Sequence, residues 1–167
     1  TNESPYLPSP AVVAAVSEAE VESIRQEMER KERKAMELAN QTADIIFPGE
    51  QQPESDHGIR YEQAKTGTDR DRHFRRAKGW FGYTLKTSKE ASRLMITTRK
   101  NDPMKVVILL NNERLTADPT ISEADQEGFV TLCYPLPQKL GAGNYPIRFS
   151  PDGTEWTPAI YEIRLLE

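Results

Sequence analysis

The sequence contains little cysteine and histidine, and it has no long apolar run. A single cysteine, Cys133, excludes a disulfide within the chain and a zinc site built on cysteines. Two histidines, His57 and His73, supply too few nitrogen ligands for a histidine zinc site. The longest apolar runs, 12–16 and 106–110, are far shorter than the ~20 residues of a membrane-spanning helix. We therefore expect no metal, no other cofactor and no membrane partner.

An excess of positive charge is also missing. The chain has 22 Lys+Arg against 26 Asp+Glu, which gives a formal net charge of -4. Neutralising phosphates requires surplus positive charge, so the charge balance argues against nucleic acid as a partner. The N-terminus has no basic stretch followed by an apolar one, so we expect no signal peptide in this chain.

The 167 residues suit one domain with a short appendage. Residues 1–16 contain three prolines and no helical period, which predicts an extended leader. Residues 17–42 predict one long amphipathic helix that acts as a linker. Ser17 followed by Glu20 matches a capping box, and an apolar stripe then recurs at three- and four-residue spacing. That stripe consists of Val21, Ile24, Met28, Ala35 and Leu38.

Residues 43–167 read as short alternating strands separated by turn residues. Asn111-Asn112 predicts a tight hairpin because asparagine tolerates positive φ, and Pro135 and Pro137 predict a turn. Many strands without intervening helices predict a mainly β protein, an antiparallel β-sandwich of the jelly-roll or galactose-binding-like kind. The strands expected are Ala43–Phe47, Ile59–Gln63, Trp80–Thr87, Arg93–Thr98, Lys105–Leu110, Glu113–Thr116, Phe129–Tyr134, Tyr145–Phe149 and Ile160–Leu166.

The densest polar cluster is residues 49–57, GEQQPESDH. Its carboxylates and histidine could form an acid–base pair or a cation site, but the ligand spacing of a calcium loop is missing. A catalytic carboxylate pair needs a fixed separation across a cleft, which one loop seldom provides. We therefore predict a structured polar loop whose side chains cap backbone groups. Its residues are Glu50, Gln51, Gln52, Glu54, Asp56 and His57.

A second cluster, residues 69–80, combines five cationic side chains with two acidic ones. Such arginines could stack on nucleic-acid bases or form Arg–carboxylate forks with the acidic loop, and the net negative charge favours the forks. Aromatic and planar polar side chains of this region could equally bind a sugar. Phe81 and Tyr83 alternate as core residues do, which argues for burial. The candidate ligand-binding residues are Arg72, His73, Trp80, Phe81, Tyr83 and Trp156.

Several of these phrases resemble the C-terminal module of glycoside hydrolase family 127, which includes bacterial β-L-arabinofuranosidases. They are GEQQPESDH at 49–57, RHFR at 72–75, AKGWF at 77–81, KVVILLNNE at 105–113 and IYEIRL at 160–165. The resemblance covers residues 17–167. It implies an accessory sandwich beside an (α/α)6-barrel that carries the chemistry, because the family's cysteine nucleophile and zinc site are absent here. A parent that acts on polysaccharide would place the module in the periplasm or outside the cell.

Three hypotheses follow. The first is a non-catalytic sandwich that supports or positions the catalytic domain of a parent hydrolase. The second is a carbohydrate-binding module that recognises plant-type glycans, with an oligosaccharide as its partner. The third is a hydrolase that uses Glu50, Glu54 or Asp56. Exposure of the aromatic side chains separates the first two, since a stacking ring must be accessible.

Overall fold

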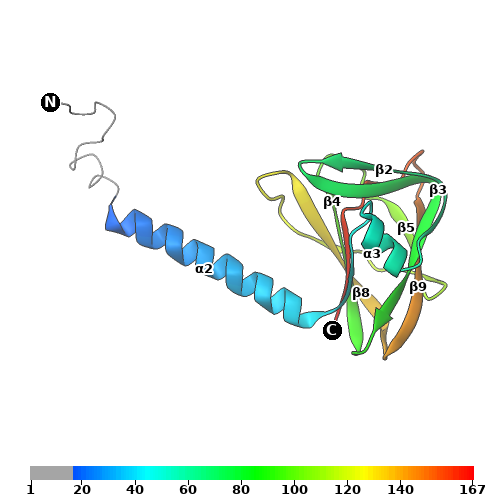
Figure 1. Ribbon diagram of the computed structural model, residues 1–167, viewed down its shortest axis with the longest axis horizontal. Coiled ribbons are helices and arrows are strands. Elements are labelled where there is room, and N and C mark those ends of the chain that lie inside the picture. Colours follow the sequence, from blue (N-terminus) through cyan, green and yellow to red (C-terminus); the bar gives the residue numbers. More distant parts are fainter. Residues whose placement is uncertain (1–16) are drawn as a thin grey trace. The chain divides into compact units, whose positions relative to one another are not determined.

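A computed structural model describes residues 17–167 of the chain (Figure 1). The leader predicted for residues 1–16 lies outside the described residues. The chain divides into two compact units, of which the second is Gln41–Glu167. Within the part described, no helix is both long and apolar enough to cross a bilayer.

The first unit is formed by helix α2 (Glu18–Gln41). The Glu20 N–H donates to the Ser17 hydroxyl at 3.1 Å, so the predicted N-terminal cap is confirmed. Two ion pairs at three-residue spacing, Glu22–Arg25 and Glu27–Arg30, support its surface. The side chains of the apolar stripe lie mostly in solvent, with Val21, Ile24 and Met28 all exposed.

The second unit is a sandwich of two antiparallel sheets, which confirms the predicted fold class (Figure 1). One sheet has the order β1 (Thr42–Ile46), β10 (Glu162–Leu166), β4 (Ala91–Arg99), β8 (Phe129–Leu140) and β7 (Thr120–Ile121). The other has the order β2 (Arg60–Asp69), β3 (Arg72–Thr87), β9 (Gly143–Pro151), β5 (Val106–Leu110) and β6 (Glu113–Arg114).

Strand alternation fills the core between the sheets. Phe81 and Leu85 of β3 face inward and are fully buried. Ile147 and Phe149 of β9 also face inward, and at most 1% of each is exposed. The Phe81 and Phe149 rings stack with their centroids 5.1 Å apart. Each such side chain contributes about 1.5–3 kcal/mol when it leaves water. The alternate residues of β3 and β9 therefore face outward.

One predicted turn is confirmed, whereas several other details differ from the sequence-based expectation. The predicted hairpin is confirmed, with φ of 54° at Asn111 and 66° at Asn112. The predicted strand beginning at Trp80 was too short, because β3 begins at Arg72 and pairs with a longer β2. The sequence of β2 shows no apolar alternation, because much of this strand is exposed on both faces. Backbone hydrogen bonds between β2 and β3 hold the pair together instead.

The predicted turn at Pro135 and Pro137 was also wrong, because β8 continues to Leu140. The register of β8 against β4 shifts after Pro135, so Pro137 lies in a bulge and no ladder hydrogen bond is lost there. Likewise, the polar loop predicted at 49–57 contains a short helix, α3 (Gln51–Asp56). Its proline, Pro53, lies in the first turn, where a helix needs no N–H donor.

Candidate functional site

The acidic segment and the arginine-rich segment meet inside the sandwich. Glu54 of α3 is 5% exposed, and Arg75 of β3 binds its carboxylate through two nitrogens on one edge of the guanidinium. Nε of Arg75 donates to Oε2 at 2.7 Å and Nη2 donates to Oε1 at 2.9 Å. The Tyr83 hydroxyl donates to the same Oε2 at 2.6 Å. This is the Arg–carboxylate fork expected from the sequence.

The Glu54 carboxylate of this fork is held in its ionised form, and the Tyr83 hydroxyl in its protonated form. Burial raises the pKa of Glu54, but hydrogen bonds from Arg75 and Tyr83 outweigh it and hold the pKa below its usual value. Burial and the neighbouring Glu54 carboxylate raise the pKa of Tyr83 well above its usual value, so the hydroxyl keeps its proton and donates. A buried glutamate with a lowered pKa is poorly suited to act as a general acid. The two hydrogen-bond partners that occupy its carboxylate therefore argue against Glu54 as the catalytic acid of the hydrolase hypothesis.

A second contact joins the end of α3 to β1. His57 Nε2 lies 3.0 Å from both carboxylate oxygens of Asp44, and Nδ1 lies 2.7 Å from the Pro53 carbonyl oxygen. The hydrogen bond to Asp44 raises the pKa of His57 against the opposing effect of burial. Burial raises the pKa of Asp44, but hydrogen bonds from His57 and the Lys86 N–H lower it overall. Helix α3 and the residue after it thus connect β1 of one sheet, through the contact of His57 with Asp44, to β3 of the other, through the contact of Glu54 with Arg75.

The remaining residues of the acidic segment contribute less. Glu50 occupies the N-cap position of α3 but makes no side-chain cap, contrary to the expectation for this loop. The Glu54 carboxylate does cap a backbone group, the Gly49 N–H. Gln51 is exposed, and Gln52 donates its amide to Asp56 at 2.8 Å. The segment is therefore mainly structural.

The predicted ligand-binding residues do not form one site. Arg72 stacks on the Phe129 ring at 4.6 Å and lies 3.7 Å from Glu162. His73 is exposed, and its Nδ1 faces the Thr68 hydroxyl at 3.3 Å. Both residues lie near the β2–β3 turn, and both side chains already contact other residues of the sandwich.

The aromatic candidates separate in the same way. Phe81 is fully buried and Tyr83 is 3% exposed, so neither offers the exposed ring expected for a sugar contact. Trp156 is half-buried, and its ring is flanked by cations of Lys65 and Arg76, each 4.8 Å from its centroid. Trp80 lines a pocket on the outward side of β3, and the buried Tyr83 borders the same pocket.

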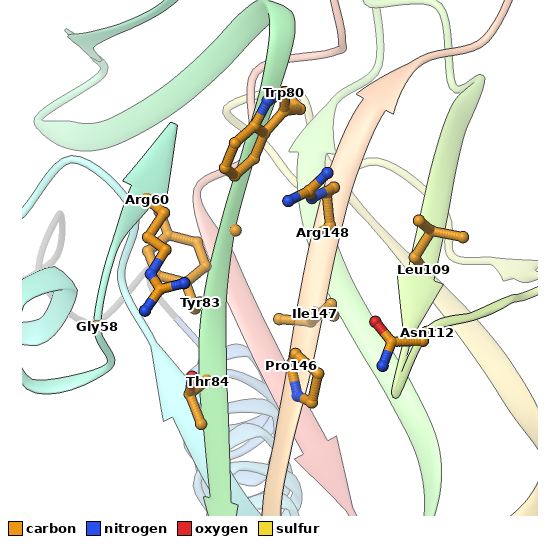
Figure 2. Close-up of a pocket in the computed structure, with 11 residues that line it drawn as sticks. Gly58, Arg60, Trp80, Tyr83, Thr84, Leu109, Asn112, Pro146, Ile147 and Arg148 are labelled. Atoms are coloured by element: carbon orange, nitrogen blue, oxygen red, sulfur yellow. The ribbon is translucent and has the colours of Figure 1, made fainter. Parts of the chain in front are cut away.

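That pocket lies on the outer face of the sheet formed by β2, β3, β9, β5 and β6 (Figure 2). Its volume is about 290 Å³. Arg60 of β2 and Arg148 of β9 lie directly opposite Gly82 of β3, one on each side. The Arg148 guanidinium stacks 3.7 Å from the Trp80 ring centroid. Asn112, from the β5–β6 hairpin, lines the other end (Figure 2).

Gly82 makes this pocket possible. A Cβ atom at this position would lie 2.5 Å from the Ile147 carbonyl oxygen, so any other residue would force β3 and β9 apart. Because glycine has no side chain, the centre of the face stays open between the two arginines. Arg60, Asn112 and Arg148 were missed by sequence reasoning. Outward alternation could have suggested Arg148 beside Ile147, but strand register, which brings these residues together, is not visible in one sequence.

Comparisons with known proteins agree with this architecture. Residues 37–166 match a family of unknown function, DUF6805. The chain belongs to this family. No curated protein sequence matches this DUF6805 protein.

Three of the solved structures similar to the DUF6805 chain are named as carbohydrate-binding modules. A CBM35 from Paenibacillus barcinonensis has a TM-score of 0.53 and 10% identity, covering 74% of this chain and 98% of its own. A family 6 module from Clostridium cellulolyticum, in complex with xylose, has a TM-score of 0.51 and 10% identity, covering 75% and 98%. A family 35 module from Clostridium thermocellum has a TM-score of 0.50 and 12% identity, covering 74% and 98%. At these identities the likeness shows a shared β-sandwich fold.

The fork of Glu54 leads to a stability prediction. We expect Glu54→Gln to lower the free energy of unfolding by about 3–5 kcal/mol, because it leaves the charge of Arg75 buried without a partner. Asp56→Asn, on the same helix but exposed, should change it by no more than about 0.5 kcal/mol. Urea denaturation followed by fluorescence measures both. Equal effects of the two variants would contradict the structural role of Glu54.

The pair of His57 and Asp44 predicts a pH dependence. The pKa of His57 is raised above 6.5, so the stabilisation is complete below that pH and is lost as pH rises through the folded-state pKa. We expect the free energy of unfolding of the wild type to be higher than that of His57→Gln by on the order of 2 kcal/mol near pH 6. Near pH 9 this difference should be smaller. Asp44 has a pKa lowered from 3.8, so its contribution is lost only in stronger acid.

Urea unfolding at a series of pH values provides the measurement. The control is His73→Gln, which alters an exposed ring facing only a hydroxyl and should leave the pH profile of stability unchanged. A His57→Gln difference that stays constant from pH 6 to pH 9 would refute the ionised pair.

Proposed function

We propose that the sandwich is a non-enzymatic carbohydrate-binding module and that the pocket at Trp80 is its sugar site. The similar solved structures are described as carbohydrate-binding modules, and one of them holds xylose, which supports this proposal. The observation that carries it is the position of Trp80. This ring is half-buried at a pocket on an open sheet face, whereas its neighbours Phe81 and Tyr83 are in the core.

The residues around the pocket match the two kinds of surface that a sugar ring presents. An indole offers an apolar face to the C–H groups of the ring. Because the Arg148 guanidinium covers one face of the Trp80 ring, a sugar would contact the opposite face. Asn112 can both donate to and accept from neighbouring hydroxyls, and the guanidinium groups of Arg60 and Arg148 donate in planar pairs. The volume of about 290 Å³ is at the lower end for small-molecule pockets, which favours a short stretch of saccharide.

The accessory role expected from the resemblance to glycoside hydrolase family 127 stays a prediction. We infer that, if a parent hydrolase exists, this module holds the catalytic domain near its polysaccharide. The contacts of the GEQQPESDH segment argue against a role for it in direct docking onto another domain. Glu54 binds Arg75 and Tyr83 within the sandwich, and His57 binds Asp44. A module that positions an enzyme by holding its substrate needs no such contact.

The proposal predicts a tryptophan-specific loss of binding. In isothermal titration calorimetry of the full chain against neutral and acidic oligosaccharides, including arabinose- and galactose-containing ones, we expect at least one ligand to bind. Trp80→Ala should weaken that binding at least tenfold, because base or sugar stacking on an aromatic ring is typically worth more than 1 kcal/mol.

Trp156→Ala is the matched control. Its ring is also half-buried but is flanked by Lys65 and Arg76 rather than by a pocket, so its removal should leave affinity unchanged. Absence of binding across the whole panel, or a loss confined to Trp156→Ala, would overturn the proposed site.

A further inference from the structure

Two arginines at the pocket have no acidic partner. Arg60 and Arg148 are both exposed and lie opposite Gly82 from the two neighbouring strands. Residues directly opposite each other in antiparallel strands share a face, so both side chains rise from the same side of the sheet, about 10 Å apart at their bases. Over residues 17–167, neither arginine forms an ion pair with a carboxylate.

This lack of partners is not explained by a shortage of acids. The chain has more acidic than basic residues, 26 against 22. Five other arginines of the sandwich are matched with carboxylates, in the pairs Arg72–Glu162, Arg75–Glu54, Arg99–Asp69, Arg114–Asp152 and Arg164–Glu162. Within residues 17–167, Arg70, Arg76 and Arg93 also form no ion pair with a carboxylate, but none of these three lines the pocket. Glu62 lies on the same face, opposite Trp80 and two residues from Arg60, yet it forms no ion pair with either pocket arginine. The pocket therefore holds two uncompensated positive charges.

The geometry also orients one of these charges. Arg148 is held against the Trp80 ring at 3.7 Å, which fixes the plane of its guanidinium without neutralising it. A guanidinium held in one plane can bind a carboxylate through two parallel N–H···O bonds. Between the two arginines, Gly82 leaves room for the bound group (Figure 2).

From these observations we infer that the preferred ligand is an acidic saccharide, in which a uronic acid carboxylate lies between Arg60 and Arg148. This inference rests on the proposed carbohydrate-binding function and specifies its ligand. Sugar stacking would use Trp80 and hydroxyl recognition would use Asn112, while the two guanidinium groups select the charge. A neutral sugar in this pocket would leave both cations without a partner.

The test compares matched acidic and neutral ligands by isothermal titration calorimetry on the full chain. The probes are oligogalacturonate, its methyl ester, a neutral galactan oligosaccharide and a sulfated galactose oligosaccharide. We expect oligogalacturonate to bind at least tenfold more tightly than its methyl ester. Raising the salt concentration should weaken the acidic ligand only, because exposed charges are screened.

Arg60→Ala gives the cleanest variant, since Arg60 is exposed and Arg148 also supports Trp80. It should lower the affinity for oligogalacturonate at least tenfold and that for any neutral ligand by a clearly smaller factor, because a neutral ligand loses only hydrogen bonds to its hydroxyls. Arg70→Ala, which removes an exposed arginine at the β2–β3 turn outside the pocket, should change neither. Thermal unfolding of each variant checks that the sandwich is intact.

The outcomes separate the two proposals. Tight binding of the methyl ester or the neutral galactan that depends on Trp80 but not on Arg60 would overturn the acidic preference and leave the sugar-binding function standing. Binding of the sulfated ligand alone would overturn the assignment to a carboxylate. If no saccharide binds, the proposed function itself fails.

Discussion

The buried fork between Glu54 and Arg75 is the contact on which the arrangement of the sandwich depends. It joins the helix that follows β1 to the long strand β3, and the Glu54 carboxylate also accepts hydrogen bonds from Tyr83 and the Gly49 backbone. A displaced strand would leave one charge buried alone, which costs several kcal/mol, so the fork favours a single register. The same strand carries Trp80 and Gly82, and its register therefore sets the shape of the outer pocket.

The pocket and the core are two sides of one alternation. Phe81 and Tyr83 supply apolar filling and the hydrogen bond to Glu54, while Trp80 and Gly82 supply a ring and a gap on the opposite face. The adjacent strands continue this division, because Arg148 stands outward beside the buried Ile147 and Phe149. Recognition chemistry can thus change on the outer face with little effect on packing.

Sequence reasoning reached the fold class and the internal fork because both depend on local signals. Alternation marked β3 and β9, Asn111-Asn112 marked a hairpin, and opposite charges in two segments suggested a fork. The pocket was only partly accessible. Trp80 stood out as an aromatic residue, but Arg60 and Arg148 are distant in the chain and meet only through the pairing of three strands. Tyr83 was included among the ligand contacts because one sequence does not reveal that its hydroxyl serves Glu54.

The prolines late in β8 have a consequence for how copies of this protein behave when crowded. Beyond Cys133, β7 no longer pairs with the free side of β8, which leaves an open strand margin. Pro135 and Pro137 provide no amide hydrogen there. A strand from another molecule could therefore not form a continuous ladder of hydrogen bonds along this edge of β8. Copies of the protein are therefore hindered from joining edge to edge into a shared sheet.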